Sequence, residues 1–560
     1  MKNQIKEILK NKKILSYSII ILATIFTCIP LFSKYMDISL DDGIQHICRI
    51  IGTHASLKEG NMFPVIMSGL CEGFGYSWNI FYSPLTAYLP LIFKLFTDSY
   101  VVCLKLFMFF TMLLSGIFMY KLVYKIHKTH TSGIIAALIY ITAPYHLTDL
   151  YTRIAIAELT SFMFLPIVFI GMYDLCKENK RNALLTIGAI GLTLTHNVIT
   201  IYTAIFCLIY LLINYKNVKN KQIMKIILIN VLIILLCTSF YWIPLLEHYL
   251  ATTYEVFIPG RMFTNDVLIE SKLSIMDLFI DIPWGLNFHI GLPIIFGLIL
   301  TFIYRNKVEN KYQKDIVTFL AFGCISIIMT LKIFPFEYLP NVLKMLQFTW
   351  RMMEFEIFFL SIVSGVMITI FIKNSNTKRM ILAIIFIIYT EILILSAKEM
   401  TQVPFNEDKY ITPIPLKTIV GPIYPGCATL EYLPKRAFEN LKYIKTRTEK
   451  CIILEGIADI VNENKNGTKL TFEVKNVNDK VVIELPYIYY LGYSAKLIEQ
   501  NDNSKSIKIK ESNKGFCMIE VADVESGTIE ITYEGTMAMK TSYALTFIGI
   551  FLLLLEKMHI

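Results

Sequence analysis

The sequence has 560 residues, of which 55% are hydrophobic and only 17% are charged. This balance excludes an ordinary soluble domain. The net charge of +9 comes from lysines and arginines in short loops between apolar runs, so it does not indicate a nucleic-acid partner. The 11 cysteines are scattered and show no CxxC pair and no Cys/His metal spacing. The sequence therefore predicts a polytopic membrane protein.

Apolar runs follow one another along most of the chain, and a bilayer is crossed by roughly 20 residues of helix. The first run is longer than a signal-peptide core and lacks a small-residue cleavage site, so it predicts a retained helix. The runs lie near residues 14–32, 79–96, 100–123, 131–149, 155–176, 182–195, 197–214, 224–245, 289–304, 316–335, 350–372, 379–397 and 541–555.

Basic residues mark the loops expected on the cytoplasmic side. The alternation of basic loops with loops poor in Lys and Arg is consistent only if one early run does not cross, and 79–96 is interrupted by Pro84 and Pro90. We therefore predict about twelve spanning helices, both termini in the cytoplasm, and external loops at 33–99 and 246–288. The Ile-, Lys- and Asn-rich composition suggests a bacterial cell membrane protein.

Residues 400–540 differ from the rest of the chain, because short β-type runs there are separated by Asn, Asp, Gly and Ser. In "GTIEITYEG", Ile529 and Ile531 alternate with polar neighbours, as in a half-buried strand. The predicted organisation is a transmembrane domain at 1–399, an extracytoplasmic β-sandwich-like domain at 400–540 and a C-terminal anchor at 541–560.

The stretch "SLDDGIQHICRI" follows the first apolar run and carries Asp41, Asp42, His46 and Arg49. If residues 41–59 are helical, Asp42, His46 and Arg49 share one face. One interpretation is structural: Asp42 caps the helix, and Arg49 contacts lipid headgroups. The other is a functional site at the membrane surface.

Further polar residues fall at predicted external ends of the helices, where ionisable groups are costly and are functional candidates. Interfacial anchoring and ordinary turn contacts are the structural alternatives for each of them. The candidates are Tyr82 in "NIFYSPL", Tyr151, Arg153 and Glu158 in "APYHLTDLYTRIAIAE", His196 and Asn197 in "LTHN", and Gln347 and Arg351 in "LQFTWR".

External carboxylates and arginines at a lipid surface suit a lipid-phosphate substrate. Arginine binds phosphate through its planar fork of donors, and a carboxylate can take a proton from an attacking hydroxyl. These two roles together describe sugar transfer from a polyprenyl-phosphate sugar.

The chain resembles the GT-C superfamily of membrane glycosyltransferases and, within it, the YfhO-like bacterial membrane proteins, which overlap with proteins described as 6-pyruvoyl-tetrahydropterin synthase-related. The resemblance is carried, in order, by "DDGIQHICRI", "GFGYSWNIFYSPL", "APYHLTDLYTRIAIAE", "LTHN", "LQFTWR", "EYLP" and "YYLGY". Thr349 departs from the commoner Pro before Trp. No zinc-binding histidine set supports pterin chemistry.

The resemblance implies an α-helical GT-C-like fold and an acidic residue of the first external loop as catalytic base. That residue is Asp42, with Asp41 as second choice and His46 as its neighbour. The expected donor-phosphate ligands are Arg351, Arg153 and Arg49, and the expected substrate contacts are Tyr82, Tyr151, Glu158, His196, Asn197 and Gln347. The sequence specifies no cofactor and does not decide metal dependence, and two adjacent aspartates can hold a divalent cation such as Mg²⁺ or Mn²⁺.

The expected function is therefore an inverting glycosyltransferase. It would move a sugar from a polyprenyl-phosphate donor in the membrane lipid to an envelope polymer or glycolipid acceptor on the outer face. Two alternatives stay open at this point: a transporter or flippase of lipid-linked glycans, and a non-catalytic envelope assembly protein. A transporter would place its ionisable groups near the bilayer midplane. The sequence does not specify the sugar, the acceptor or the oligomeric state.

Overall fold

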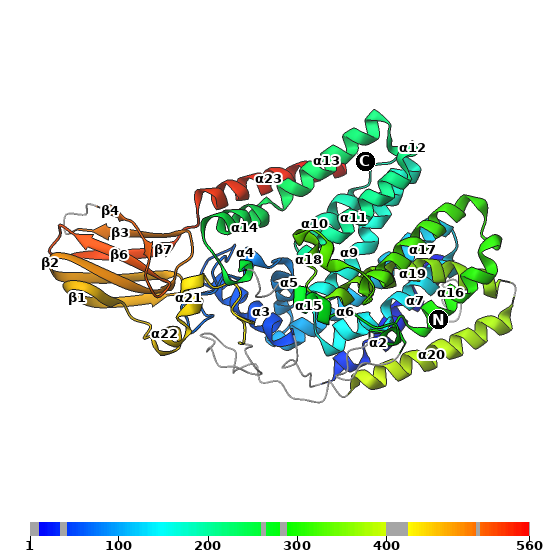
Figure 1. Ribbon diagram of the computed structural model, residues 1–560, viewed down its shortest axis with the longest axis horizontal. Helices are drawn as coiled ribbons and strands as arrows, with labels where there is room; N and C mark the ends of the chain where they lie inside the picture. The colour runs from blue at the N-terminus through cyan, green and yellow to red at the C-terminus, as the bar shows by residue number, and fades with distance from the viewer. Residues whose placement is uncertain are drawn as a thin grey trace.

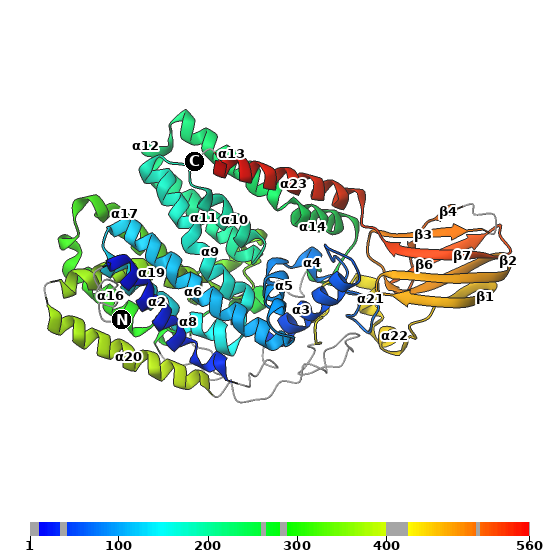
Figure 2. The same cartoon turned by 180° about the vertical axis from the view of Figure 1, so that it is seen from behind.

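The computed structural model describes residues 11–33, 42–258, 265–279, 288–373, 375–398, 424–499 and 504–558. A large helical part carries a smaller β-sheet at one end, and the last helix returns from the sheet along the helical part (Figures 1 and 2). The protein is thus a helical membrane protein with a C-terminal antiparallel sheet.

The predicted apolar runs form helices, because a helix satisfies backbone polar groups within its own segment. Ser99 begins α6 by accepting a hydrogen bond from the backbone N–H of Val102, and Lys128 ends it in a left-handed conformation. The helices of the first half are α2 (Lys12–Thr27), η1 (Ile29–Phe32), α3 (Gly43–Lys58), α4 (Trp78–Phe81), α5 (Leu85–Tyr88), η2 (Leu89–Leu95), α6 (Tyr100–His127), α7 (His130–Ile141), α8 (Pro144–Leu147), η3 (Thr148–Thr152), α9 (Ile156–Tyr173), η4 (Asp174–Glu178), α10 (Ala183–Thr193), α11 (Asn197–Ile213) and α12 (Tyr215–Val218).

The second half continues in the same manner up to the junction with the sheet. Its helices are α13 (Lys221–Cys237), α14 (Ser239–Ala251), η5 (Glu255–Phe257), α15 (Asn265–Glu270), η6 (Met276–Leu278), α16 (Leu292–Tyr304), η7 (Arg305–Lys307), α17 (Asn310–Thr330), η8 (Phe336–Tyr338), α18 (Asn341–Lys344), η9 (Thr349–Met352), α19 (Met353–Ile372), α20 (Asn376–Lys398), α21 (Lys435–Glu439), α22 (Leu441–Thr446) and α23 (Met537–Met558).

Among the described residues, five helices are long and apolar enough to cross a membrane, or seven if each of two bent pairs forms one span. The bent pairs are α7 with α8–η3 and α13 with α14. Residues 79–96 form three short helices, and the Leu85–Leu95 stretch falls short of the roughly 20 residues that a span requires. The total of about twelve spans stays a prediction.

Helices α9 and α19 occupy the centre of the helical part. In the most apolar 18-residue stretch of each span, 89% of the residues are buried for α9 and 83% for α19. A membrane helix enclosed on all sides by other helices does not need to be wholly apolar. These two helices carry Glu158 and Glu354, both fully enclosed, while Arg351 lies in η9 at the start of α19. Charged groups are therefore concentrated on the central helices.

Residues predicted on opposite sides of the membrane gather at different places in the helical part. At one, Lys125 pairs with Asp174, and Lys177 lies 2.6 Å from Asp315, so three predicted cytoplasmic loops meet. At the other, the starts of α3 and α9 meet η9, all of which are predicted external. The predicted alternation of the loops, and the side that faces outward, stay predictions.

The seven strands in the described part of the chain form one curled antiparallel sheet in the order β4-β3-β7-β2-β6-β5, with β1 paired to β2. The long β2 pairs with β7 through residues 470–474 and with β6 through residues 480–488, so its two halves serve different neighbours. Ile529 and Ile531 of β7 point into the core, as their alternation predicted. The strands are β1 (Ile452–Asn466), β2 (Lys469–Ile488), β3 (Tyr493–Ile498), β4 (Ser504–Ile507), β5 (Lys510–Glu511), β6 (Phe516–Ala522) and β7 (Gly527–Tyr533).

Residues 424–434, here called the junction segment, connect the sheet to the helical part. The backbone N–H of Ala428 donates to Gln45 of α3 at 2.9 Å, and the indole N–H of Trp78 donates to the carbonyl of Gly426. Tyr432 stacks on Phe81 with ring centroids 5.2 Å apart. The sheet is thereby fixed to the helices α3 and α4, in the predicted first external loop.

Candidate functional site

Asp42 immediately precedes α3, and its carboxylate faces the start of α9. Its side chain makes no capping hydrogen bond to α3, so capping by this side chain is not what the structure shows. Instead, one carboxylate oxygen lies 3.3 Å from Nη2 of Arg153, and the backbone N–H of Asp42 donates to the Arg153 carbonyl. The Asp42 side chain is 43% exposed, whereas that of Arg153 is 4% exposed. Asp42 is therefore an accessible carboxylate held by a buried cation.

Glu158, in the first turn of α9, is the centre of a buried charged cluster. Arg153 contacts both of its carboxylate oxygens, at 2.9 and 3.1 Å, and Nε of Arg351 donates to it at 2.8 Å. Tyr145 donates its phenolic proton at 2.6 Å. Arg153 also bonds Asp149 at 2.8 Å. We call Asp42, Asp149, Arg153, Glu158 and Arg351 the charged cluster.

Arg351 reaches the charged cluster from η9 and is held in place by Gln347. Its Nη1 donates to the Gln347 side chain at 3.1 Å and to the Leu346 carbonyl at 2.9 Å. Within the described parts of the chain, Nη2 of Arg351 has no hydrogen-bond partner, and the side chain is 12% exposed. Arg351 therefore retains a donor that a bound anion could use.

Thr349, which stands where the family more often has Pro, anchors η9. Its backbone N–H donates to the Ser271 hydroxyl at 2.9 Å, and its own hydroxyl donates to the Ser271 carbonyl at 2.8 Å. These bonds hold the turn from which Arg351 projects, so the departure from the family pattern has a structural role.

His196 and Asn197 lie beside the charged cluster but make ordinary helix and turn contacts. His196 caps α11 by accepting the Ile199 N–H, and its Nε2 is 3.9 Å from Glu158. Asn197 accepts from the Ser83 hydroxyl at 2.7 Å and donates to Tyr241. His196 therefore reaches the charged cluster, whereas Asn197 joins α11 to the turn after α4.

Arg49 is a buried cation without a carboxylate partner among the residues that the structure describes. Its guanidinium donates to Thr86, Asn79 and the carbonyls of Tyr82 and Ser83, and lies 4.6 Å from the ring centroid of Tyr82. Burial lowers the pKa of Arg49 to about 10, which leaves it charged at neutral pH. An unbalanced buried charge attracts anions.

His46 lies one helical turn after Asp42, as predicted, and is buried close to several cations. Burial, together with the charges of Arg49 and Arg153, lowers the pKa of His46 to about 3. The imidazole is therefore neutral at physiological pH. Its ring meets that of Tyr82 edge-on, with centroids 6.2 Å apart.

Tyr151 is a further predicted site residue that is not brought into the charged cluster. The hydroxyl of Tyr151 donates to the Thr27 carbonyl at 2.7 Å, so this side chain fastens η3 to α2 and does not face the other candidates. Asp41 lies outside the described residues.

Four polar residues near the site were not among the predicted site residues. Tyr145 and Asp149 stand in the quoted "APYHLTDLY" stretch, and their spacing to Arg153 was the available signal. Glu354 accepts a hydrogen bond from Ser161 at 2.6 Å, directly beside Glu158. Glu431, in "EYLP", is 4% exposed and accepts bonds from the Thr429 N–H and hydroxyl, each at 3.0 Å. Only the fold brings the junction segment to this place.

Strained backbone adjoins three of the site residues. Ile154, Gln347 and Leu430 have φ of 52°, 66° and 65°, in the left-handed region that β-branched and long side chains rarely adopt. They stand next to Arg153, within the Arg351 turn and next to Glu431. Such strain costs about 1–3 kcal/mol per residue and is concentrated at functional sites. Three of the twelve non-glycine residues with positive φ among the described residues therefore lie at or next to the site.

The titration of Glu431 yields a first prediction. Burial raises the pKa of its carboxyl from 4.5 to about 7, and nearby Asp42 adds to the rise. The folded protein therefore holds a proton that the unfolded chain loses between these values, and stability falls as pH rises from about 4.5 to 7. We expect this loss, at most about 3 kcal/mol, to disappear in Glu431→Gln.

Thermal unfolding of purified protein between pH 5 and 8 measures this effect. Glu431→Gln should match the wild type near pH 5 and melt at a higher temperature near pH 8, while Glu439→Gln, an exposed residue of α21, should follow the wild type throughout. Parallel pH curves for the wild type and Glu431→Gln would contradict the prediction.

Among the described residues, no group of three or more His, Cys, Asp or Glu side chains is arranged to hold a metal ion. The charged cluster is instead balanced by arginines. Three carboxylates face the two guanidinium groups of Arg153 and Arg351, with Arg49 near enough to act on His46. Its three carboxylates and two arginines form an ion-pair network in which Asp42 is the accessible carboxylate.

The fold and this site together define a helical membrane protein with a buried ionic site at one end of its helical part. The chain belongs to the family described as 6-pyruvoyl-tetrahydropterin synthase related domain, a membrane protein family, whose model matches residues 80–402. An uncharacterized protein of Lactococcus lactis subsp. cremoris (strain MG1363) is 26% identical to it, over 97% of this chain and 95% of its own length. The resemblance to the 6-pyruvoyl-tetrahydropterin synthase-related membrane proteins is thereby confirmed.

Proposed function

We propose that the protein is a GT-C-like inverting glycosyltransferase, with about twelve spans, a sandwich-like external domain and its site on the outer face of the membrane. The donor would be a polyprenyl-phosphate sugar and the acceptor an envelope polymer or glycolipid. One observation supports this most: an accessible carboxylate, Asp42, is held by Arg153 against the buried charged cluster.

In the proposed reaction, Asp42 accepts the proton of an acceptor hydroxyl as its oxygen attacks the anomeric carbon of the donor. The bond from that carbon to the phosphate oxygen breaks, and its electrons remain on the departing polyprenyl phosphate. One displacement inverts the configuration, and no sugar becomes attached to the protein. The negative charge that grows on the phosphate is stabilised by fixed cations.

The contacts divide the arginines into two roles. Both Nη atoms of Arg153 contact carboxylates, so Arg153 positions Asp42 and Glu158 and is a poorer donor ligand than its sequence position indicated. Arg351 keeps an Nη2 without a partner among the described residues, and Arg49 lacks a counterion there. Arg351 and Arg49 are therefore the proposed phosphate ligands.

Replacing Arg351 by Lys should weaken donor binding, because lysine keeps the charge but loses the guanidinium fork. We expect the KM for donor to rise about tenfold or more, a loss of roughly 1.4 kcal/mol. Donor titration at saturating acceptor measures this change. Arg305→Lys, an exposed conservative change in η7, is the matched control and should leave KM unaltered. An unchanged KM in Arg351→Lys would remove Arg351 from donor binding.

The proposed function itself is tested with purified protein in proteoliposomes that contain radiolabelled polyprenyl-phosphate sugars. Release of polyprenyl phosphate together with loss of sugar from the lipid is the expected result. Movement of intact lipid-linked sugar between leaflets, without release, would support the flippase alternative. If donors of several sugar types show no release and no movement between leaflets, the result favours a non-catalytic assembly protein.

A further inference from the structure

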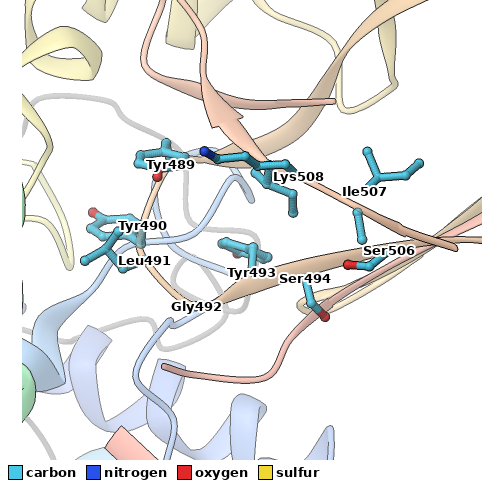
Figure 3. A pocket seen from close by; sticks show the side chains of 11 residues that line it. Tyr489, Tyr490, Leu491, Gly492, Tyr493, Ser494, Ser506, Ile507 and Lys508 are labelled. Atoms are coloured by element: carbon cyan, nitrogen blue, oxygen red, sulfur yellow. The ribbon is translucent and has the colours of Figure 1, made fainter. Parts of the chain in front are cut away.

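A cavity of about 280 Å³ opens in the β-sheet part, away from the charged cluster (Figure 3). Its wall consists of the turn between β2 and β3 and the connection from β4 to β5. The lining residues are Tyr489, Tyr490, Leu491, Gly492, Tyr493, Ser494, Ala495, Ser506, Ile507, Lys508 and Ile509. The cavity includes the "YYLGY" stretch, to which the charged cluster assigns no role.

The turn that forms this cavity is firmly held. The carbonyl of Gly492 accepts hydrogen bonds from the backbone N–H groups of Glu534 and Gly535, at 3.0 and 3.1 Å. Gly492 has a φ of 112°, and a Cβ there would lie 2.9 Å from Gly535, so only glycine permits this approach. The backbone N–H of Tyr489 donates to Gly515 at 3.0 Å. The cavity is therefore preformed and does not need a ligand to order it.

The chemistry of the wall matches a charged sugar. Tyrosine offers a flat, rigid face with a polar tip, which suits a ring that has C–H groups on one face and hydroxyls at its edge. Ser506 is exposed and adds a hydroxyl. Lys508 is exposed, and its side chain runs toward Tyr489 in Figure 3. The ammonium group of Lys508, at the wall of the cavity, can attract an anionic substituent of a bound molecule.

The back of the cavity is connected to the site through packed rings. The hydroxyl of Tyr490 donates to the carbonyl of Tyr432 at 3.0 Å, and its ring stacks parallel to Tyr254 at 6.1 Å. The ring centroids of Tyr254 and Phe81 are 4.6 Å apart, and the Phe81 ring stacks on that of Tyr432 in the junction segment. These contacts fix the cavity relative to Glu431 and Asp42.

We propose that this cavity binds one hexose unit bearing a carboxylate or phosphate, and that it serves as the acceptor-polymer subsite. The acceptor role depends on the proposed glycosyltransferase function, whereas the binding of the charged hexose does not. A cavity of this volume accepts a single sugar residue, and about a dozen non-hydrogen atoms at ordinary efficiency give a dissociation constant in the millimolar range.

Saturation-transfer NMR on the full chain in nanodiscs tests this proposal, with glucuronic acid, glucose 6-phosphate and glucose as probes. Glycoside detergents are omitted, because their sugar headgroups would compete. We expect millimolar binding of both charged sugars and weaker binding of glucose. Binding of glucuronic acid alone would assign a carboxylate ligand, and binding of glucose 6-phosphate alone a phosphate ligand.

Matched variants make the test specific. Lys508→Ala should weaken binding of the charged sugars about two- to fivefold and leave glucose binding unchanged, a difference typical of one exposed charge contact. Tyr489→Ala should weaken the binding of all three sugars, whereas Tyr489→Phe, which keeps the ring, should retain most of the wild-type affinity. Lys505→Ala, an exposed lysine of β4 outside the lining, should change nothing.

Equal binding by wild type and Lys508→Ala, or no binding of any probe, would overturn the cavity proposal even if the protein transfers sugar. Binding that follows the expected pattern in a protein without transfer activity would overturn the glycosyltransferase function and leave the cavity assignment standing. The two failures are therefore distinguishable.

Discussion

Replacing Asp42 by Asn is expected to slow sugar transfer by about 10²–10⁴ while leaving the fold and donor binding intact, because Asn cannot accept the acceptor proton. The Asp42 side chain is 43% exposed, and the buried Arg153 keeps its bonds to Asp149 and Glu158 after the change. An amide oxygen can still accept a bond from Arg153. The loss should therefore appear in kcat.

Turnover and donor binding by the same Asp42→Asn preparation measure this prediction. Asp98→Asn, an exposed carboxylate of the same predicted loop, is the control and should keep full activity. If Asp42 served only the α3 terminus, Asn would replace it almost freely, because Asn and Asp are about equally good at helix starts. A fully active Asp42→Asn protein would exclude Asp42 as the base.

Replacing Glu158 by Gln is expected to destabilise the protein by about 3–5 kcal/mol, because it leaves buried guanidinium groups without their shared carboxylate. Glu158 is 2% exposed and is contacted by Arg153, Arg351 and Tyr145. A loss of this size lowers the melting temperature markedly and reduces the yield of folded protein. Thermal unfolding and size-exclusion profiles measure the change.

A second variant separates charge imbalance from loss of shape. Glu158→Gln combined with Arg351→Gln removes one anion and one cation, so the double variant should be less destabilised than the sum of the two single variants. Glu309→Gln, which breaks an exposed pair with Lys311, should leave stability unchanged. Additive losses in the double variant would show that Glu158 and Arg351 do not act as a pair.

Periodicity and charge were sufficient to predict the helical elements of this protein. The apolar runs became helices, and the interrupted run at 79–96 became three short ones because Pro84 and Pro90 limit each helix. The β-type runs after residue 450 became strands, with Ile529 and Ile531 inward. Helices and strands depend mainly on residues close together in the sequence, so a local sequence pattern can predict them.

The candidate site was predictable as a list but not as an arrangement. Asp42, Arg153, Glu158, His196, Gln347 and Arg351 were all recognised as polar residues at apolar boundaries, and the structure brings them together. Which carboxylate would be central was not evident. Glu158 is enclosed by Arg153, in the turn before α9, and by Arg351 of η9. Such pairing depends on how segments that are far apart in the sequence pack together.

Tyr151 and Glu431 show the limits in opposite directions. Tyr151 stands between Asp149 and Arg153 in sequence, yet the turns of η3 direct its hydroxyl to Thr27. Glu431 lies almost 400 residues after Asp42, yet the junction segment packs on α3 and brings the two carboxyls into electrostatic contact. Sequence distance predicted neither outcome.

The sequence by itself determined that the chain is a membrane protein, because lipid requires long apolar helices whose backbone groups are satisfied internally. It also determined which polar residues are costly enough to matter, since each such residue stands out against apolar neighbours. Only the tertiary structure decided which of these residues form ion pairs or hydrogen bonds with one another. Electrostatic interactions act over a few ångströms, and those distances are set by how the starts of α3 and α9, η9 and the junction segment pack together.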